Sequence, residues 1–379
     1  MKKTIKTNHG EIKTPAFMPD ATYGSIKTVS FNDVKKAGIK EIVTTTLHIE
    51  QKVGSIYIKK FGGIHKFFKW DRPILTDSGG WQVFSLINSP KSNGKNKLTN
   101  AGCTFVDPST GKTSLLTPEN SIQIQLNLGS DILTVLDIPI DPTISLEERK
   151  KATTLNSLWA QRAKKYFDQN KLPGQLLGAV IQGGDDFELR KQSAKDLAEL
   201  DFDLYNFGGI PLYSEVSWKY DYPQGLYREM LHFVKSLIPD DKISYAMGVG
   251  MPDDIAYCVD IGWDLFDTVL PTRNARHGFL FVSEGQGDAT RSYKSPFDDS
   301  KLSKKSFSYD ILHLRNKRYE FDENPVDVNC TCECCKSVSR AYLRYLIRIK
   351  EPAGFRLATI HNLTFYANWV NKLMISISN

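Results

Sequence analysis

The sequence has no long hydrophobic run. Nowhere in its 379 residues does an uncharged apolar stretch approach the length of about 18 residues that a membrane-spanning helix requires. The basic residues at its start are not followed by an apolar segment, so no secretory signal is expected there. With 41% hydrophobic and 24% charged residues, the composition excludes an intrinsically disordered chain. These absences favour a cytoplasmic globular protein without a membrane partner.

Cysteine is scarce and unevenly placed. Four of the six cysteines fall between Cys330 and Cys335, whereas a disulfide framework would distribute them along the chain. Crowded cysteines in a cytoplasmic protein indicate a metal site instead. The net charge is only +6, so the sequence is compatible with a polyanionic partner such as a nucleic acid but does not require one.

Short apolar runs alternate with longer amphipathic segments through most of the chain. Helices are expected over Pro118–Leu128, Leu146–Phe167, Phe187–Leu200 and Pro252–Ile261, and proline in the first turn supports the first and last of these. The expected strands are Phe17–Ala21, Glu41–Thr45, Ile74–Asp77, Ile132–Asp137, Leu177–Gln182, Leu204–Gly208, Ser244–Met247 and Leu265–Leu270. Eight strands with intervening helices predict an α/β fold of the (β/α)8 TIM-barrel type. A doubly wound open sheet is the alternative, because a sequence pattern does not show closure.

Two regions interrupt this alternation. Residues 88–100 are polar and basic, which predicts a hairpin-like insertion near 88–115 within a catalytic barrel of residues 1–284. Residues 285–329 are polar and irregular, and they lead into the cysteine cluster. We therefore expect residues 285–379 to form a zinc-binding subdomain whose terminal helices pack on the barrel.

The cysteine cluster has the spacing of a structural zinc site. Cys330, Cys332 and Cys335 offer three thiolates in a Cys-x-Cys-x-x-Cys pattern, and His361 can supply a fourth ligand. Three sulfurs and one imidazole suit tetrahedral Zn2+, and four protein ligands leave no position for a substrate. Cys334 is not expected to bind, since consecutive residues rarely point at one ion. A reduced, metal-free thiol cluster is the alternative.

A row of cations follows the cysteine cluster. Lys336, Arg340, Arg344 and Arg348 recur every four residues, so a helix would display them as one stripe suited to an RNA phosphate backbone. A solvated basic face without a partner is the alternative interpretation.

Acidic and amide residues stand at the ends of predicted strands, where barrel enzymes place their chemistry. These residues are Asp77, Asp137, Gln182 and Asp267. Three carboxylates and an amide suit a planar hydrogen-bonding ligand such as a purine, and two carboxylates can divide nucleophile and acid/base roles at a sugar carbon. The alternative is that each aspartate caps a helix or forms a turn.

Three motifs together resemble the tRNA-guanine transglycosylases: Leu75–Phe84 (LTDSGGWQVF), Phe266–Gly278 (FDTVLPTRNARHG) and the cysteine–histidine spacing. The resemblance implies exchange of the wobble guanine of a tRNA with a G-U-N type anticodon for a free 7-deazaguanine base. It implies Asp267 as the nucleophile that forms a covalent ribose ester, and Asp77 as the general acid/base. It also implies structural Zn2+, no redox or nucleotide cofactor, and a homodimer.

The same resemblance implies which residues bind the two substrates. Asp137 is expected to accept from the purine N1–H and amino group, Gln182 to recognise O6, and Trp81 to pack on the base. The implied base-binding residues are Asp77, Ser78, Gly79, Gly80, Trp81, Asp137, Gln182 and Gly209. The implied RNA-binding residues are Gly248, Val249, Gly250, Met251, Pro252, Asp253, Asp254, Thr272, Arg273, Asn274, Ala275 and Arg276.

Two departures from the family pattern leave the incoming base open. Ile138–Pro139 stands where bacterial relatives usually have Glu-Cys, and Ile210–Glu215 replaces a shorter segment that carries a glutamate. The 7-aminomethyl, 7-cyano and queuine bases are all candidates. Two other functions are alternatives, namely a paralogous enzyme that inserts a 7-deazaguanine into DNA and a catalytically silent RNA-binding accessory subunit. The presence of both Asp77 and Asp267 argues against the silent subunit.

Overall fold

The computed structural model describes residues 3–87, 97–107, 111–141, 143–209, 224–297, 302 and 305–378. Eight parallel strands form one sheet in the order β3-β13-β12-β11-β10-β9-β5-β4, and helices alternate with them along the chain. Strands that follow one another in this alternation are neighbours in the sheet, as in a (β/α)8 barrel and unlike the order of a doubly wound sheet. The predicted α/β barrel fold is therefore confirmed.

The chain forms two compact units. One comprises Lys6–Glu11 and Val43–Met247 and is called the 43–247 unit below. The other comprises Met1–Ile5, Ile12–Ile42 and Gly248–Asn379 and is called the 248–379 unit.

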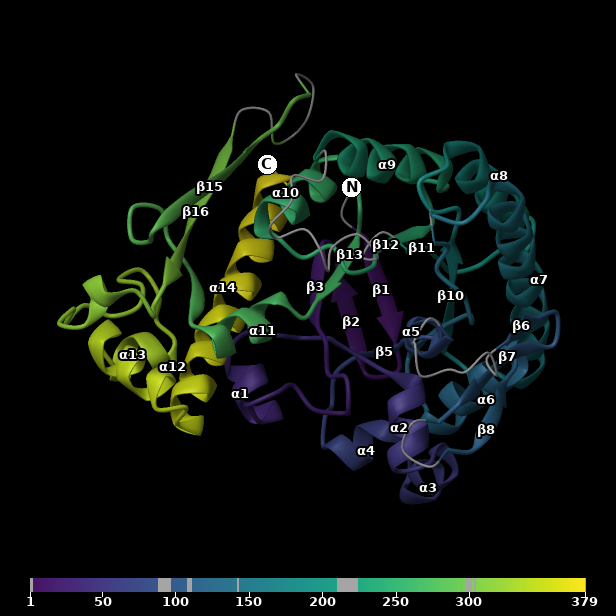
Figure 1. Cartoon of the computed structure of the whole chain (residues 1–379), viewed down its shortest axis with the longest axis horizontal. Helices are drawn as coiled ribbons and strands as arrows, with labels where there is room; N and C mark the ends of the chain where they lie inside the picture. The colour runs from purple at the N-terminus through teal and green to yellow at the C-terminus, as the bar shows by residue number, and fades with distance from the viewer. Residues whose placement is uncertain are drawn as a thin grey trace. The chain divides into compact units, whose positions relative to one another are not determined.

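Buried strands form the centre of the 43–247 unit (Figure 1). They are β5 (Ile74–Thr76), β9 (Ile132–Thr134), β10 (Leu176–Ile181), β11 (Leu204–Phe207) and β12 (Ile243–Ala246), while β4 (Ile42–Thr44) begins at the boundary of the unit. Gly178 of β10 pairs in parallel register with Leu204 on one side and Thr134 on the other. Continuous apolar runs such as LLGAVI suit strands buried on both faces, which is why the sequence predicted these strands.

Helices follow the strands of this unit. They are α2 (Thr46–Lys52), α3 (Ser55–Phe61), α4 (Ile64–Phe68), α5 (Gly80–Ile87), α6 (Pro118–Leu128), α7 (Leu146–Asn170), α8 (Phe187–Ala198) and α9 (Gln224–Leu237). In Figure 1, α7 and α8 flank β10, against which both pack. Ser145 begins α7 with a capping box, because its hydroxyl accepts from the N–H of Glu148 while the Glu148 carboxylate accepts from the Ser145 N–H.

The insertion in the 43–247 unit is a three-stranded antiparallel sheet. Its strands are β6 (Lys97–Thr99), β7 (Gly102–Val106) and β8 (Thr113–Leu116). Cys103 and Phe105 of β7 are buried in one hydrophobic cluster with Ile138 and Trp159. This packing fixes the insertion beside the chain segment that carries Asp137.

The 248–379 unit contains two neighbouring strands of the parallel sheet, β3 (Ala16–Pro19) and β13 (Leu265–Thr268). Its helices are α1 (Phe31–Lys36), α10 (Pro252–Asp260), α11 (Leu270–His277), α12 (Glu333–Ser337), α13 (Arg340–Arg348) and α14 (Pro352–Ser376), with a 3-10 turn at Lys317–Tyr319. The long helix α14, yellow in Figure 1, packs against β3, α10, α11, α12 and α13. A separate two-stranded hairpin is formed by β1 (Thr4–Thr7) and β2 (Gly10–Lys13).

The prediction that residues 285–329 are irregular is wrong for much of this region. β15 (Ala289–Lys294) and β16 (Ser306–His313) form an antiparallel sheet with β14 (Phe279–Val282). Phe307 and Tyr309 of β16 are buried at alternate positions, as expected for a strand with one face in the core. Serine, aspartate and histidine between the apolar residues hid this alternation in the sequence.

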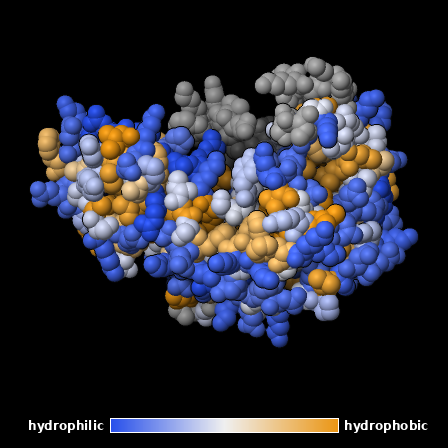
Figure 2. Space-filling view, turned by 90° about the horizontal axis from the view of Figure 1, so that it is seen from below, coloured by the Kyte–Doolittle hydropathy of each residue, from blue (hydrophilic) through white to orange (hydrophobic). Residues whose placement is uncertain are grey.

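Within the described ranges, no helix combines the length and the apolar character needed to cross a lipid bilayer. Hydrophilic residues cover most of the face seen in Figure 2, and hydrophobic residues lie between them in separate patches. The exposed large hydrophobic side chains include Tyr342 and Tyr345 of α13 and Ile349 directly after it.

Candidate active site and metal centre

Asp77 directly follows β5 and is surrounded by hydrogen-bond donors. Its Oδ1 accepts from the backbone N–H groups of Thr46 (2.8 Å) and Gly79 (3.2 Å), and its Oδ2 accepts from Nε2 of Gln82 (2.9 Å). Burial nevertheless raises the pKa of this carboxyl to about 6, and the nearby carboxylate of Asp137 adds to the increase. A carboxyl that titrates close to neutrality can both donate and accept a proton.

Asp137 is a second buried carboxyl in the same unit. Ser78 Oγ donates to its Oδ1 and Gln182 Nε2 donates to its Oδ2, both at 2.8 Å. Burial raises the pKa of Asp137 despite these two donors. The structure therefore brings together Ser78, Asp137 and Gln182, three residues that the resemblance assigned to base binding. Asp77 lies close enough to interact with the Asp137 carboxyl group.

Close packing around this cluster requires two glycines. A Cβ atom at Gly80 would lie 1.8 Å from the backbone carbonyl oxygen of Asp137. A Cβ atom at Gly209, whose φ is +94°, would lie 2.7 Å from Oε1 of Gln182. Oε1 of Gln182 is buried and has no hydrogen-bond partner among the described residues, so it is free to accept from a ligand.

Trp81 lies in the first turn of α5, next to Gly80. Its side chain is 39% exposed, and the centroid of its ring lies 6.2 Å from that of Phe84. An exposed indole on a helix beside Asp77 suits packing on a planar base.

Asp267 is the third residue of β13 in the 248–379 unit. Its side chain is partly exposed, and its Oδ1 accepts from the backbone N–H of Gly248 at 2.8 Å. Gly250 gives space to the neighbouring strand residue Thr268, because a Cβ atom at position 250 would lie 2.2 Å from Thr268 Oγ1. The turn of residues 248–254 thus orients the carboxylate that the sequence predicts as the nucleophile.

Helix α14 anchors this turn and α11 through backbone carbonyl oxygens. Tyr366 Oη donates to the carbonyl oxygen of Gly250 at 2.7 Å, and Trp369 Nε1 donates to that of Pro252 at 2.8 Å. Asn362 Nδ2 donates to the carbonyl oxygen of Pro271 at 2.9 Å. The two segments that the resemblance assigns to RNA contact are therefore held by one buried helix face.

One residue of the predicted RNA-contacting turn faces the interior. Asp253 is buried, and its carboxylate pairs with Arg291 (2.7 Å) and accepts from the hydroxyl of Tyr309 (2.7 Å). The Asp253 side chain therefore ties α10 to β15 and β16, and the contact of the turn with RNA stays a prediction.

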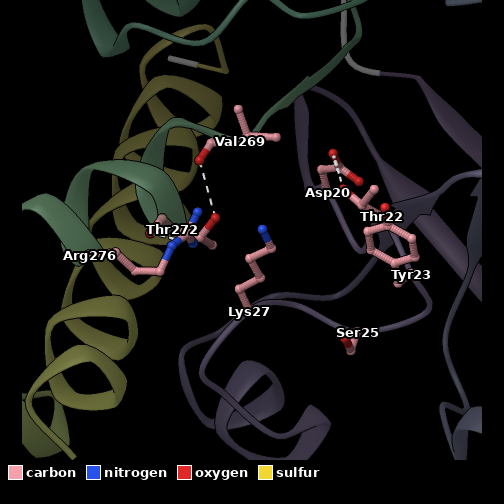
Figure 3. Close-up of a pocket in the computed structure, with 8 residues that line it drawn as sticks. All are labelled: Asp20, Thr22, Tyr23, Ser25, Lys27, Val269, Thr272 and Arg276. Atoms are coloured by element: carbon pink, nitrogen blue, oxygen red, sulfur yellow. Dashed lines mark hydrogen bonds between the residues drawn. The ribbon is translucent and has the colours of Figure 1, made fainter. Parts of the chain in front are cut away.

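A cavity of about 130 Å3 lies beside α11 in the 248–379 unit (Figure 3). Its lining residues are Asp20, Thr22, Tyr23, Ser25, Lys27, Val269, Thr272 and Arg276. Arg276 Nη1 donates to the carbonyl oxygen of Thr272 at 2.8 Å, and burial together with the charge of Arg273 lowers the Arg276 pKa. Sequence reasoning found Arg276 but missed Lys27, whose position after β3 follows no charge pattern.

The predicted metal ligands converge. Each of Cys330, Cys332, Cys335 and His361 offers one ligand atom, and these atoms all lie within 4.8 Å of one another. Nδ1 of His361 lies 3.2 Å from Sγ of Cys335 and 3.7 Å from Sγ of Cys332. Nε2 of His361 lies 2.8 Å from the carbonyl oxygen of Phe281, so Nε2 carries the proton and Nδ1 is left as the ligand. This donor set fits a tetrahedral metal ion.

Cys334 does not belong to this group of ligands. It is fully buried in a hydrophobic cluster with Leu343, Ile347 and Ala358, and burial raises the pKa of its thiol. Its role is therefore packing, as its position between two predicted ligands indicated.

The predicted basic stripe is wrong. Lys336 belongs to α12, whereas Arg340, Arg344 and Arg348 belong to α13, which begins after its own N-cap, Ser339. Arg340 and Arg344 are both 8% exposed, and their guanidinium groups donate to backbone carbonyl oxygens at 2.9 and 3.1 Å. The break between the helices and the burial of the two central arginines leave Lys336 and Arg348 as separate exposed cations.

The structure describes only one of the two segments in which the predicted base pocket departs from the family pattern. Ile138 is buried beside Asp137, and its backbone N–H donates to Oδ1 of Asn156 at 2.8 Å. The segment Ile210–Glu215 lies outside the described residues.

Comparison with known proteins gives one consistent result. The family model described as queuine tRNA-ribosyltransferase matches residues 3–379. The queuine tRNA-ribosyltransferase of Psychrobacter cryohalolentis is 39% identical over 376 residues, which cover 99% of this chain and 88% of the relative. The protein of that name from Neisseria gonorrhoeae is 39% identical over 363 residues (96% and 87%), and that from Chromobacterium violaceum is 36% identical over 374 residues (99% and 90%).

Proposed function

The chain belongs to the queuine tRNA-ribosyltransferase family, and from this premise we propose that it exchanges guanine at the wobble position of a tRNA for a free 7-deazaguanine base. Membership of the family makes the protein a transferase that acts on tRNA. The wobble position, the G-U-N type anticodon and the 7-deazaguanine are our proposal. The observation that carries it is the environment of Asp77, a carboxyl with a pKa of about 6 that lies beside the buried hydrogen-bonding cluster of Asp137 and Gln182.

We propose that the reaction proceeds by two displacements at ribose C1′. In the first, a carboxylate oxygen of Asp267 bonds to C1′ as the glycosidic C1′–N9 bond breaks, and the departing guanine takes the proton of Asp77. The hydrogen bond from the Gly248 N–H keeps the Asp267 carboxylate oriented for this attack. The covalent ester holds the RNA on the enzyme after the base has left.

In the second displacement, the ionised Asp77 removes a proton from the incoming base. A nitrogen of that base bonds to C1′ and the ester bond to Asp267 breaks, which restores a glycosidic bond with retained configuration. The same carboxyl must therefore act first as an acid and then as a base, and a pKa of about 6 makes both forms accessible near neutral pH.

Recognition of the purine is proposed to rest on the buried cluster. The Asp137 carboxylate accepts from the purine N1–H and amino group, and Ser78 keeps one of its oxygens in place. Gln182 donates to O6 from the Nε2–H that is not used by Asp137, Gly209 contributes its backbone, and Trp81 packs on the base. A charged acceptor at a fixed position favours guanine-like bases over adenine, because adenine has no N1–H to donate.

The metal centre is proposed to hold structural Zn2+. Three thiolates and one imidazole fill the four positions that zinc prefers, so the ion would join α12 to α14 and take no part in the chemistry. Cys330, Cys332, Cys335 and His361 are the proposed ligands.

The RNA is proposed to contact the turn of residues 248–254 and α11. Arg273 and Arg276 supply guanidinium groups suited to phosphates and base edges, and Lys27 adds a second cation to the cavity that Arg276 lines. The resemblance also implies a homodimer, for which the exposed Tyr342 and Tyr345 of α13 are candidate contacts.

Covalent trapping tests this function. Wild-type protein mixed with a tRNA that has a U-G-U anticodon should give an RNA–protein adduct on a denaturing gel, and the adduct should disappear when a 7-deazaguanine is added. Asp267→Asn should abolish the adduct, because the amide keeps the bond to the Gly248 N–H but is a poor nucleophile. Asp260→Asn is the matched control, since its amide oxygen can still accept from Tyr293. An adduct that persists in Asp267→Asn contradicts the mechanism.

The same assay separates the other functions. Exchange of labelled guanine out of a DNA hairpin but not out of tRNA would identify a DNA-modifying enzyme, and no exchange on either polymer would favour a silent RNA-binding subunit. Offering the aminomethyl, cyano and queuine bases in turn identifies the incoming substrate.

A further inference from the structure

Two histidines and an aspartate meet in the 43–247 unit outside the proposed active site. His9 lies in the turn between β1 and β2, His65 lies in α4, and Asp131 directly precedes β9. Asp137 follows β9 at its carboxyl end, so this cluster stands at the opposite end of the same strand. We propose that His9, His65 and Asp131 form a second metal site, for a divalent transition ion such as Zn2+.

The distances already suit a shared ion. Nδ1 of His9 lies 2.7 Å from Oδ1 of Asp131, and Nε2 of His65 lies 3.0 Å from Oδ2 of the same carboxylate. The ligand atoms of all three residues lie within 4.8 Å of one another. Two ligands that bind one tetrahedral zinc ion at about 2.0–2.1 Å are roughly 3.4 Å apart, so the two distances to the Asp131 carboxylate are close to those that a shared ion requires.

The two imidazole rings lie close enough to share an ion. They are stacked, with centroids 3.3 Å apart and planes at 10°. An ion cannot lie in the planes of two parallel rings, and binding therefore requires one ring to turn. The side chain of His9 is 35% exposed and has room to do so.

The buried nitrogen of His65 gives a second, independent indication. Although Nε2 of His65 is 3.0 Å from the Asp131 carboxylate, it forms no hydrogen bond of acceptable geometry within the described part of the chain. A buried imidazole nitrogen without such a bond is costly. A cation between the ring and the carboxylate would satisfy both groups.

Asp131 is held rigidly enough to serve as a ligand. Its Oδ2 accepts from the backbone N–H of Ile74 at 2.9 Å, its own N–H donates to the Ile74 carbonyl oxygen at 3.0 Å, and its carbonyl oxygen accepts from Leu176 at 2.9 Å. These bonds fix it between the amino ends of β5 and β10. Backbone support of this kind orients a carboxylate and improves metal affinity.

The ligand set indicates both the chemistry and the role of the ion. Two imidazoles and one carboxylate suit zinc and similar ions, and the exposed side of His9 provides access and leaves a coordination position to water. The hairpin of β1 and β2 has only four residues in each strand, and such a hairpin is marginally stable by itself. The ion would fasten its turn to the strand ends of the 43–247 unit.

Metal titration of the full chain tests the proposal. Calorimetric titration with Co2+ of protein that holds one equivalent of Zn2+ should show one additional ion for the wild type. His9→Ala and His65→Ala should each weaken this event at least tenfold, whereas His232→Ala, which removes an exposed histidine of α9, should leave it unchanged. Cys335→Ala should retain the additional event, because the two sites share no ligand.

The outcomes are independent of the transferase reaction. Circular dichroism shows whether each variant is folded. If the His65→Ala protein is unfolded, the Co2+ affinity of the His9→Ala protein decides the result, because the side chain of His9 is partly exposed. No additional ion in the wild type, or an unchanged affinity in a folded His9→Ala protein, overturns the proposal.

Discussion

Gln82 donates a hydrogen bond from Nε2 to Oδ2 of Asp77 at a distance of 2.9 Å. This bond stabilises the ionised carboxyl and lowers the pKa of Asp77. Burial has the opposite and larger effect, so the pKa is raised to about 6. Gln82 lies in the first turns of α5, so the helix that presents Trp81 also sets the pH at which Asp77 changes from acid to base.

Replacing Gln82 with methionine should raise the pKa of Asp77. A hydrogen bond to a charged group contributes about 1.5–3 kcal/mol, and part of this loss corresponds to about one pKa unit. Because the proposed mechanism requires protonated Asp77 for release of guanine, the wild-type rate should fall as pH rises through about 6, and the fall should occur at higher pH in Gln82→Met. Single-turnover release of labelled guanine between pH 5 and 9 measures this. Identical profiles for the two proteins contradict the assignment.

Asp77→Asn should be more stable than the wild type at pH 8. The folded-state pKa of about 6 exceeds the ordinary value of 3.8, so the native protein binds more protons than the unfolded chain between these values and loses stability as pH rises through them. We expect an advantage of about 1 kcal/mol for the variant at pH 8, discounted for partial exposure of the group, and none below pH about 4. Urea unfolding at pH 8 and at pH about 4 measures the difference in the free energy of unfolding. A variant that is less stable than the wild type at pH 8 would contradict the raised pKa of Asp77.

Asp137→Asn should weaken binding of the free base more than binding of tRNA. The side-chain amide of the Asp137→Asn variant would direct an N–H group at the purine, which itself presents N–H donors at this place. Loss of the charged acceptor should weaken binding of the base by about 1.5–3 kcal/mol. The KM for the 7-deazaguanine should rise roughly 10- to 100-fold, while the KM for tRNA changes little. Steady-state kinetics with each substrate varied in turn decides this, and equal effects on both KM values exclude a specific contact with the base.

Cys335→Ala and Cys334→Ala should behave differently although the two residues are adjacent. Cys335 offers its sulfur to the ligand set, whereas Cys334 packs in the hydrophobic cluster. Elemental analysis should show loss of one bound ion in Cys335→Ala together with a lower melting temperature. Cys334→Ala should keep the ion and lose only about 1 kcal/mol for the small cavity. Equal metal content in both variants would refute the ligand assignment.

Arg276→Ala and Arg340→Met should separate an RNA contact from a structural arginine. Arg276 lines the cavity beside α11, so its removal should weaken tRNA binding about tenfold and reduce the salt dependence by about one counterion. Arg340 is buried and bonded to backbone carbonyl oxygens, so its replacement should lower the melting temperature and leave the affinity of the folded protein unchanged. Binding titrations at three salt concentrations distinguish the two effects, and a larger loss of affinity in Arg340→Met contradicts them.

The sequence predicted the barrel well because buried parallel strands carry continuous apolar runs, and the observed strand order follows the chain. It also predicted Asp137 and Gln182 together, because residues at the carboxyl ends of such strands share one edge of the sheet. It missed β15 and β16, since polar residues interrupt their apolar alternation.

Other features depend on where one helix ends and the next begins. The spacing of residues in the sequence does not give this information. The cations after the cysteine cluster have helical spacing, yet Ser339 starts a new helix and turns Arg340 and Arg344 inward. Gln82 and Lys27 gave no signal because their roles come from tertiary neighbours. The division into residues 1–284 and 285–379, the homodimer and the roles of the catalytic residues remain predictions.

The donors of α14 to the turn at residue 250 and to α11 stand at positions 362, 366 and 369, directly after the ligand His361. Spacings of four and three keep these residues on one face of the helix. Inserting or deleting a single residue upstream would rotate that face by about 100° and release the turn, α11 and the metal ligand together. Side chains elsewhere on α14 can therefore be exchanged, but the number of helical residues that precede Trp369 cannot change without loss of these bonds.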